Sequence, residues 1–340
     1  MTASGDPGRT ATKAGTVTVA LCTYNGANWI RYQVRSIVEQ TIPPRQLVLS
    51  DDGSTDRTVE LALDEFEAAG GDRLGIELVV IRNGQTLGVV ANFEQALRAS
   101  GREFVALSDQ DDVWHPRRLE RALLAFDRRP SLLLVHCDAQ LVDRDGEPLG
   151  RTLAHTQGLT SKERSQIADG RELECLVRRR LVTGATVVLR RQLLIDALPI
   201  PPRWMHDEWL GVVAAAKNGT DFIDETLVDY RQHGGNQVGV RRRTLNEKFE
   251  LLTGAGGERN RRLVEQWAAL VDRLTLIPDV PPRNRAFAAG RLAHETFRAG
   301  LSRNRLRRMA PVGLRAVRGD YRRYARGSKD VLLDLIQPSD

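Results

Sequence analysis

Residues 103–115 read EFVALSDQDDVWH, a short apolar run that leads directly into three aspartates within four positions. Residues 104–107 have the composition of a buried strand, and burial gives such a strand no reason to end in carboxylates. Asp109, Asp111 and Asp112 repel one another, and each is costly to bury unless a positive charge joins them. Two interpretations stay open for these residues alone. They hold a hard divalent cation that carries the phosphates of a ligand, or they form a solvated turn that caps the next helix.

Around this stretch, the first 140 residues alternate strand-like and helix-like patterns. Such alternation is typical of a mostly parallel sheet with helices on its faces. We expect strands over residues 17–21, 46–50, 76–81 and 104–107. The helices expected between them cover residues 29–38, about 55–66 with Ser54 or Thr55 as N-cap, and 89–98, and a further helix begins at Pro116.

The second half of the chain is expected to complete an α/β domain and then become helical. The predicted segments are a strand and hairpin over 131–146, a polar mobile loop over 150–180, a strand over 181–189, a helix over 206–219 and a strand over 221–231. Beyond about residue 245 the pattern is helical, with breaks expected at 254–257, 278–282 and Pro311. The prediction is therefore a disordered tail over 1–15, a main domain over 16–240 and a helical appendage over 241–340.

The composition is that of a globular protein, with 340 residues that are 41% hydrophobic and 28% charged. No apolar run approaches the roughly eighteen residues of a membrane helix, and the first residues lack the apolar core of a signal peptide. The cysteines, Cys22, Cys137 and Cys175, fit neither a disulfide framework nor a zinc cluster. We therefore expect a cytoplasmic protein.

Charge is divided unevenly along the chain. Residues 241–340 contain 22 Lys and Arg against 11 Asp and Glu, so they carry +11, whereas the first 240 residues carry −5. A basic tail on an acidic body suggests that the tail faces an anionic partner. The alternative is that the many arginines simply reflect codon usage and form a solvated face.

Three polar clusters follow the expected parallel strands: Cys22-Thr23-Tyr24-Asn25, Asp51-Asp52-Gly53-Ser54 and Asp109-Gln110-Asp111-Asp112. Open parallel sheets bind ligands beyond the carboxyl ends of their strands. Each cluster alone is weakly specific, but three on successive strand ends predict a shared binding site.

Several longer motifs carry a resemblance to the family 2 glycosyltransferases with the GT-A fold. These motifs are TYNGANWIRYQVRSIVEQ, VLSDDGSTDRT, LGVVANFEQAL and SDQDDVW. The last of them, together with HDEW and YRQHGGNQVG, is most similar to the bacterial rhamnosyltransferase branch. The resemblance covers roughly residues 16–240 and implies a GT-A domain with a mostly parallel sheet flanked by helices.

The resemblance also implies roles for individual residues. Asp109-Gln110-Asp111 corresponds to the DXD motif, with Asp111 as the principal metal ligand and Asp109 near the ribose and the metal. The implied nucleotide contacts are Thr23, Tyr24, Asn25 and Asp52. Asp112 stays open between a functional role and a helix cap, and Trp114 is expected to pack.

In the second half, Asp207 matches the position of the catalytic carboxylate, with helix capping as the alternative. His206 precedes it where the family more often has Glu, so it is expected to touch the acceptor or the leaving group. Gly184 is expected to let the donor or acceptor approach the backbone, or to mark a bulge. His233 resembles a further metal or diphosphate ligand, and Arg231 is suited to hold a diphosphate. The glycines at 234, 235 and 239 suggest a loop that closes over the donor.

Taken together, the resemblance implies an inverting, metal-dependent transferase that uses Mg²⁺ or Mn²⁺. The implied donor is dTDP-L-rhamnose and the implied acceptor a cell-surface glycan or lipid-linked saccharide. The alternatives are a UDP-hexose or UDP-galactofuranose donor, and a non-catalytic nucleotide-sugar-binding protein. We expect no nucleic-acid partner, because the tail lacks a recognised reading motif. Membrane docking at the inner face of the cell membrane suits the tail better. The arginines expected to meet anionic headgroups are Arg303, Arg305, Arg307, Arg308, Arg315 and Arg318.

Overall fold

The sheet order places β1 at the point where the chain reverses direction across the sheet. The computed structural model describes residues 16–233 and 256–337, and there the strands form one sheet in the order β3-β2-β1-β4-β8-β6-β9-β5, with β7 paired to β6. The four strands β3, β2, β1 and β4 are parallel, whereas β8 is antiparallel to both β4 and β6. The chain therefore moves outward from β1 on one side and returns to β4 on the other, and a ligand crevice opens at such a point.

The bounds of the elements follow the chain. The strands are β1 Val17–Thr23, β2 Gln46–Asp51, β3 Glu77–Arg82, β4 Phe104–Ser108, β5 Val113–Trp114, β6 Leu134–Val142, β7 Pro148–Thr152, β8 Val187–Arg190 and β9 Thr220–Arg231. The helices of the sheet region are α2 Ile30–Val38, α3 Thr58–Ala68, α4 Val89–Ala99, α5 Arg118–Arg128, α6 Leu153–Gln157, α7 Ser161–Ala168, α8 Glu172–Leu176, α9 Leu193–Ala197 and α10 His206–Ala216. The C-terminal helices are α12 Gly256–Leu276, α13 Pro282–Ala299, α14 Arg305–Val317, α15 Asp320–Tyr324 and α16 Ser328–Ile336.

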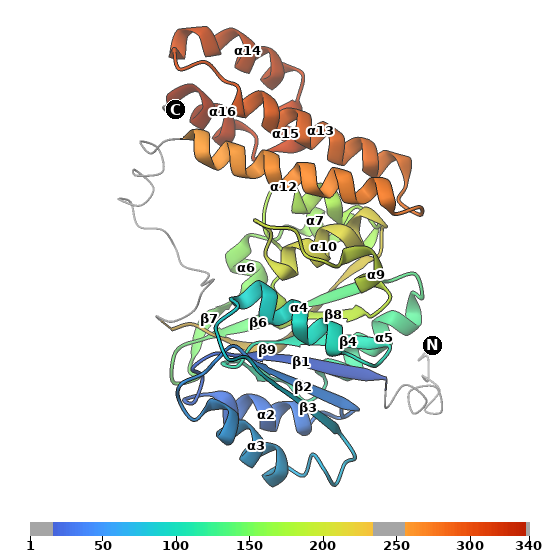
Figure 1. Ribbon diagram of the computed structural model, residues 1–340. Helices are drawn as coiled ribbons and strands as arrows, with labels where there is room; N and C mark the ends of the chain where they lie inside the picture. The colour runs from blue at the N-terminus through green and yellow to red at the C-terminus, as the bar shows by residue number, and fades with distance from the viewer. Residues whose placement is uncertain (1–15, 234–255, 338–340) are drawn as a thin grey trace.

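Helices cover both faces of the sheet (Figure 1). In β1, Val19 and Leu21 belong to the core shared with α2 and α3, whereas Ala20 and Cys22 belong to the core shared with α4 and α10. Because successive side chains of a strand point to opposite faces, a strand that is covered on both sides must be apolar throughout. All seven residues of β1 are buried. The prediction of a mostly parallel α/β sheet followed by a helical region is confirmed.

Two predictions for the middle of the chain are wrong. Residues 150–180, predicted as an irregular loop, contain α6, α7 and α8, and α7 begins with a capping box between Thr160 and Glu163. Helices this short show too few turns for a hydrophobic period to be recognised. Residues 181–189 are not one strand, because a 3₁₀ turn over Gly184–Thr186 precedes β8.

Two capping and breaking predictions are also corrected. α3 begins at Thr58 with Arg57 as its N-cap, so neither Ser54 nor Thr55 caps it. Pro311 lies inside α14, because Val312 in the next position is fully buried against α15 and anchors the helix there. The break expected at 278–282 is confirmed between α12 and α13. The expected tail over 1–15, the boundary at 240, the glycine loop at 234–239 and residues 254–255 of the expected break lie outside the described residues, whereas Gly256 and Gly257 begin α12.

The C-terminal helices attach to the sheet region through a cluster of tryptophans. Trp204 contacts Trp209 of α10 at 5.6 Å between ring centroids and Trp267 of α12 at 6.1 Å. The Trp204 indole Nε1 also donates to the Gln266 carbonyl at 2.9 Å. All three indoles are at most 7% exposed, so apolar burial holds the helical region against α10. None of the helices within the described residues is long and apolar enough to cross a membrane.

We expect Trp267→Ala to lower the free energy of unfolding by about 3–5 kcal/mol, because it leaves a cavity between α10 and α12. Leu276→Ala, on the same helix but at a side chain that is 79% exposed, should change it by less than about 0.5 kcal/mol. Urea unfolding measures the free energy of unfolding of both variants, with backbone circular dichroism as the signal because one variant lacks a tryptophan. Equal stability of the two variants would contradict the attachment described here.

Candidate functional site

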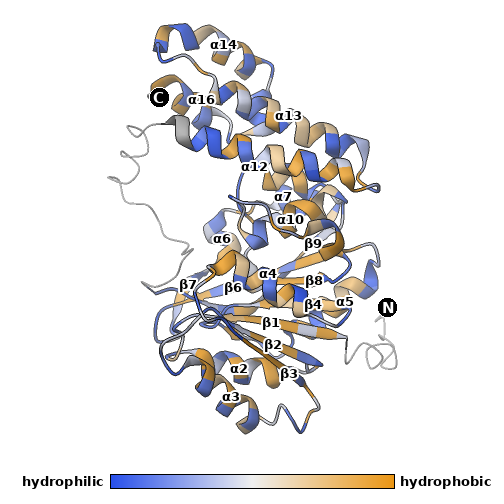
Figure 2. Cartoon of the chain, viewed as in Figure 1, coloured by the Kyte–Doolittle hydropathy of each residue, from blue (hydrophilic) through white to orange (hydrophobic). Residues whose placement is uncertain are grey.

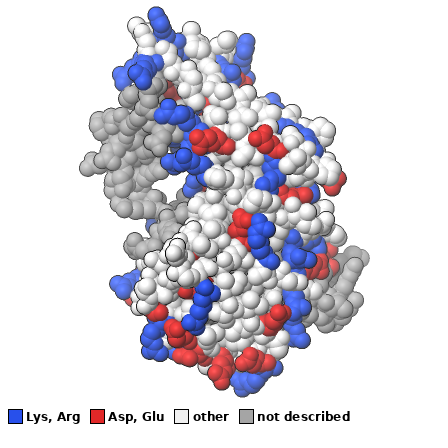
Figure 3. Space-filling view, in the orientation of Figure 1, with Lys and Arg blue, Asp and Glu red and all other residues white. Residues whose placement is uncertain are grey.

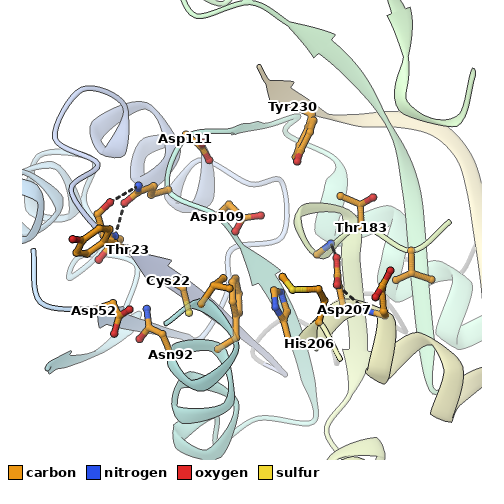
Figure 4. A pocket seen from close by; sticks show the side chains of 18 of the residues that line it. Cys22, Thr23, Asp52, Asn92, Asp109, Asp111, Thr183, His206, Asp207 and Tyr230 are labelled. Atoms are coloured by element: carbon orange, nitrogen blue, oxygen red, sulfur yellow. Dashed lines mark hydrogen bonds between the residues drawn. The ribbon is translucent and has the colours of Figure 1, made fainter. Parts of the chain in front are cut away.

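The three polar strand ends meet at one edge of the sheet, around a cavity of about 430 Å³. Since β2, β1 and β4 are parallel neighbours, their carboxyl ends must lie side by side. Of the predicted site residues, Thr23, Tyr24, Asp52, Asp109, Asp111, Gly184, Asp207 and His233 line this cavity. Figure 4 shows Asp109 between Asp111 on one side and His206 and Asp207 on the other.

An amide clamp joins the first and third strand ends. The Tyr24 backbone N–H donates to Gln110 Oε1 at 2.8 Å, and Gln110 Nε2 donates to the Tyr24 carbonyl at 2.9 Å. Gly26 is required here, because a Cβ at this position would lie 2.1 Å from Gln110 Oε1. The Tyr24 ring itself remains 43% exposed at the cavity, where it is free to cover a flat ligand group.

Asp52 is held by the start of α4. Its Oδ1 accepts from the Leu87 N–H at 2.7 Å and its Oδ2 from the Gly88 N–H at 2.9 Å. The carboxylate therefore satisfies free amides that precede a helix, and this fixes α4 against the end of β2. Asp52 also lines the cavity. The expected contact with a nucleotide base would therefore use the same side chain that holds the start of α4.

The carboxyl groups of the acidic cluster, Asp109, Asp111 and Asp112, outnumber the buried positive charges near them. Burial, followed by the charges of Asp111 and Asp207, raises the pKa of Asp109 to about 8, and only Arg118 among the main contributors opposes the shift. Burial likewise raises the pKa of Asp112. Arg118 is 1% exposed, lies 3.6 Å above the Trp114 ring, and donates through Nη2 to the Ala185 carbonyl at 2.7 Å. The expected packing role of Trp114 is confirmed.

Asp112 is not the cap of the following helix. α5 begins at Arg118 with Arg117 as its N-cap, and Asp112 Oδ1 instead accepts from the Arg231 N–H at 3.0 Å. Its Oδ2 is buried without a hydrogen-bond partner among the described residues. The carboxyl therefore ties the loop after β4 to the end of β9, and the helix-cap alternative is wrong.

Asp111 and His233 come from distant parts of the chain and meet at the cavity. Asp111 Oδ2 lies 2.7 Å from His233 Nε2, and the imidazole stacks on Trp29 with ring centroids 4.2 Å apart. The Asp111 carboxylate is a suitable ligand for Mg²⁺ or Mn²⁺, whereas the His233 imidazole suits Mn²⁺ better than the harder Mg²⁺. Within residues 16–233 and 256–337, no three His, Cys, Asp or Glu side chains are grouped to hold a metal on their own. The residues therefore fit an ion that a ligand's phosphate oxygens help to bind.

Asp207 lies in the first turn of α10, on the opposite wall of the cavity. The N-cap of α10 is Met205, so the alternative that Asp207 serves as the N-cap is wrong. Its Oδ2 accepts from the Gly184 N–H at 2.9 Å and its Oδ1 from the Glu208 N–H at 2.8 Å. Gly184 is needed for this approach, because a Cβ there would lie 2.9 Å from His206 Nε2. The backbone thus orients this carboxylate toward the cavity.

His206 is a buried, neutral imidazole in the cavity wall. It is 4% exposed and stacks on Phe93 with ring centroids 3.9 Å apart. Burial lowers its pKa, and neither ring nitrogen has a hydrogen-bond partner among the described residues. Since buried polar groups normally have partners, these nitrogens are suited to bind a hydroxyl group of a ligand.

Asn25 and Arg231 are not among the residues that line the cavity. Asn25 Oδ1 accepts from the Thr55 N–H at 2.9 Å, so it fixes the loop after β2. Arg231 donates through Nε to the Asp111 carbonyl at 2.8 Å and through Nη1 to the Arg144 carbonyl at 2.9 Å. Its guanidinium therefore supports the acidic loop from behind.

Several lining residues were not predicted from the sequence. They are Val89, Asn92, Phe93, Gln157, Arg180, Val182, Thr183, Met205, Glu208 and Tyr230. Cys22 and Gln110, which belong to the predicted polar clusters, and His206, which was expected near the acceptor or leaving group, also line the cavity. Asn92 and Phe93 lie in the LGVVANFEQAL motif, which was a usable signal. Gln157 and Arg180 belong to the helical segment that was predicted as an irregular loop.

Comparison with known structures defines the class of the fold. TarS of S. aureus, residues 1–349 in complex with UDP-GlcNAc, is similar with a TM-score of 0.57 and 16% identity, over 83% of this chain and 72% of that one. A mannosyltransferase from Pyrobaculum calidifontis, in complex with GDP-Man and Mn²⁺, has a TM-score of 0.49 and 19% identity, over 89% of this chain and 75% of that one. The fold is thus the GT-A fold of nucleotide-sugar glycosyltransferases.

The sequence comparison points to one family. Residues 18–183, just under half of the chain, match the family described as Glycosyl transferase family 2. A dTDP-rhamnosyl transferase of Shigella flexneri, RfbG, is 28% identical over 234 residues, which cover 65% of this chain and 74% of the relative. Over the matched residues, the chain is thus similar to the family 2 glycosyltransferases.

The pH dependence of stability should report the burial of Glu208. Burial raises its pKa from 4.5 to about 7, although its ion pair with Arg180 opposes the shift. Between these two pH values the folded state binds more protons than the unfolded state, so the stability falls as the pH rises. Glu208→Gln should remove the part of this fall that Glu208 contributes, at most about 3 kcal/mol, and should leave the part that comes from Asp109 and Asp112, whose pKa values burial also raises.

Urea unfolding at about pH 4.5 and about pH 8 tests this expectation. Glu60→Gln, at a side chain that is 50% exposed on α3, is the control and should keep the wild-type pH dependence. If Glu208→Gln also keeps it, the carboxyl is not buried as described.

Proposed function

We propose that this enzyme is an inverting transferase that moves L-rhamnose from dTDP-L-rhamnose onto a hydroxyl of a cell-surface glycan or a lipid-linked saccharide. The observation that carries the proposal is one cavity with the acidic cluster on one wall and the backbone-oriented Asp207 on the other. The similarity to a dTDP-rhamnosyl transferase supports the choice of donor. A UDP-hexose or UDP-galactofuranose donor is the alternative.

The donor's diphosphate belongs at the acidic wall. A nucleoside diphosphate is itself anionic, so it approaches Asp109 and Asp111 only together with a cation. Asp111, Asp109 and His233 would hold Mg²⁺ or Mn²⁺, which when bound neutralises the negative charge of the departing diphosphate. Thr23, Tyr24 and Asp52 then lie on the nucleotide side of the cavity.

Asp207 is suited to act as the general base. As the acceptor oxygen forms its bond to the anomeric carbon, its proton passes to a carboxylate oxygen of Asp207. The bond between the anomeric carbon and the diphosphate oxygen breaks, and its electron pair leaves with the diphosphate. The Gly184 and Glu208 amides hold the carboxylate in place throughout, and the neutral His206 is positioned to bind a sugar hydroxyl.

The acceptor enters from the side of the C-terminal helices. A second cavity of about 220 Å³ shares Arg180, Val182 and Glu208 with the first. Its other charged wall residues are Arg178, Arg179, Arg259, Arg291, Arg326 and Asp330. The excess of guanidinium groups favours an acceptor with negative charge, such as a phosphate-linked saccharide.

Asp207→Asn should lower kcat by roughly 10²–10⁴-fold, because the amide cannot accept the acceptor's proton. Donor affinity should stay within about threefold, because the amide keeps the size of the carboxylate. Glu208→Gln is the matched control on the same turn and should lose less than about tenfold. Release of the nucleoside diphosphate in the presence of a saccharide acceptor measures kcat. Undiminished turnover by Asp207→Asn would exclude it as the base, and absence of turnover by the wild type with every acceptor would favour a non-catalytic binding protein.

Donor identity can be read from ligand-induced stabilisation. With Mg²⁺ or Mn²⁺ present, dTDP-L-rhamnose at about 100 times its Kd should stabilise the fold by about 2.7 kcal/mol and raise Tm, whereas UDP-glucose and UDP-galactofuranose should raise it less. Asp111→Asn should remove the part of the shift that depends on metal, and Asp64→Asn on the exposed face of α3 should retain it. A larger shift with a UDP-sugar would replace rhamnose with that donor.

A further inference from the structure

α14 has one face that is buried and one face that is apolar and exposed. Arg308 and Val312 are at most 2% exposed and anchor the helix to α15 and α16. On the opposite side, Leu306, Met309, Leu314 and Val317 are 76%, 59%, 53% and 89% exposed. Met309, Leu314 and Val317 follow Leu306 by three, eight and eleven residues. At this spacing all four side chains project from one side of the helix. We refer to these four residues as the α14 apolar face.

This face is unusual for the surface of a soluble domain. Single exposed apolar residues are normal, and Ile195 of α9, at 81% exposed, is an example. Four large apolar side chains on one helix face form a continuous patch instead, because Ala310 and Gly313, which are also exposed, lie between them. α14 lies at the end of the molecule farthest from α2 and α3, where no element of the described chain lies beyond it (Figures 1 and 2).

The charges around the α14 apolar face all have one sign. Residues 301–319 contain six arginines and no aspartate or glutamate. Two of the six are engaged in the fold: Arg308 donates to the Asp334 carbonyl at 3.1 Å, and Arg315 pairs with Asp320 at 3.3 Å. The expectation that all six face headgroups is therefore wrong for Arg308, which is buried. The exposed ones are Arg303, Arg305, Arg307 and Arg318, and Figure 3 shows Lys and Arg side chains next to uncharged surface at this end.

We propose that α14 lies in the plane of an anionic membrane surface, with Leu306, Met309, Leu314 and Val317 in the boundary between headgroups and acyl chains. The exposed arginines then meet the lipid phosphates. An apolar stripe beside exposed arginines is the pattern of helices that bind anionic bilayers in this orientation. The inference concerns a surface remote from the acidic cluster, and it does not depend on which sugar is transferred.

Charge also argues against a second copy of this chain as the partner. In a two-fold symmetric contact the α14 apolar face would pack against itself. The exposed arginines of one copy would then surround those of the other, without an acidic residue from 301–319 to balance them. Like charges brought together at an interface cost several kcal/mol. An anionic bilayer supplies the opposite charge and covers the apolar residues at the same time.

Co-sedimentation of the full chain with lipid vesicles tests the proposal. The vesicles are phosphatidylcholine alone, and phosphatidylcholine mixed with phosphatidylglycerol in equal parts. The wild type should bind the anionic vesicles at least several-fold better, and added salt should weaken this binding. Leu306→Ser with Val317→Ser should lower the partition coefficient by roughly tenfold or more. Arg305→Gln with Arg307→Gln should remove most of the preference for anionic lipid.

Matched controls separate these effects from general surface changes. Ile195→Ser removes an equally exposed apolar side chain elsewhere, and Arg57→Gln with Arg128→Gln removes two exposed cations from the sheet region. Both controls should bind as the wild type does. Since all the substituted side chains are exposed, circular dichroism should show an unchanged fold for every variant.

Two results would contradict the membrane proposal. They are failure of the wild type to bind either kind of vesicle, and unchanged vesicle binding by the Leu306/Val317 variant. A concentration-dependent dimer in sedimentation velocity that the same variant abolishes would assign the face to a second copy instead. Donor turnover with a water-soluble acceptor should be the same in this variant and the wild type, so a failure here is distinguishable from a failure of the proposed function.

Discussion

The rest of the site depends on how the fold accommodates buried carboxylates at the end of β4. The charge of Arg118 opposes the raised pKa values of Asp109 and Asp112. Its Nη2 donates to the carbonyls of Leu107 and Ala185, so one guanidinium joins the end of β4 to the turn before β8. Asp112 in turn binds the backbone of Arg231 at the end of β9. These contacts connect three strands that are far apart in sequence. Because a buried polar group that loses its hydrogen-bond partner costs about 1–3 kcal/mol, the acidic loop has little freedom to move.

The same arrangement leaves the cavity side of the loop short of positive charge. Arg118 and Arg231 contact the loop from behind, whereas Asp109 and Asp111 line the cavity itself. A site of this kind favours a ligand that arrives with its own cation, as a metal-bound diphosphate does. Asp207 lies on another element, α10, and its charge contributes to the raised pKa of Asp109. Its two backbone hydrogen bonds fix the orientation of the Asp207 carboxylate at the cavity.

How far the sequence predicts this structure depends on the range of the interactions involved. The parallel strands and their polar ends were predictable, because a strand covered on both faces is apolar throughout and then stops at the turn. That Asp109, Asp111 and Asp207 would meet followed from a family resemblance, not from local pattern. The functions of Arg231 and Asn25 in supporting loops were not predictable, since both depend on which backbone carbonyls and amides lie nearby in the fold. The buried position of Arg308 is of the same kind, because its carbonyl partner lies 26 residues along the chain.

α10 connects the two halves of the molecule. Its first turn supplies His206 and Asp207 to the cavity, and Trp209, two residues further on, packs in the tryptophan cluster that holds α12. The C-terminal helices are therefore joined to the catalytic wall by a short and fully buried path rather than by the chain connection alone. Because the protein interior is close-packed and hardly compressible, the residues along this path keep their positions relative to one another. If α14 rests on a membrane and the acceptor is the lipid-linked saccharide proposed above, this path sets the height of Asp207 above the bilayer that holds both.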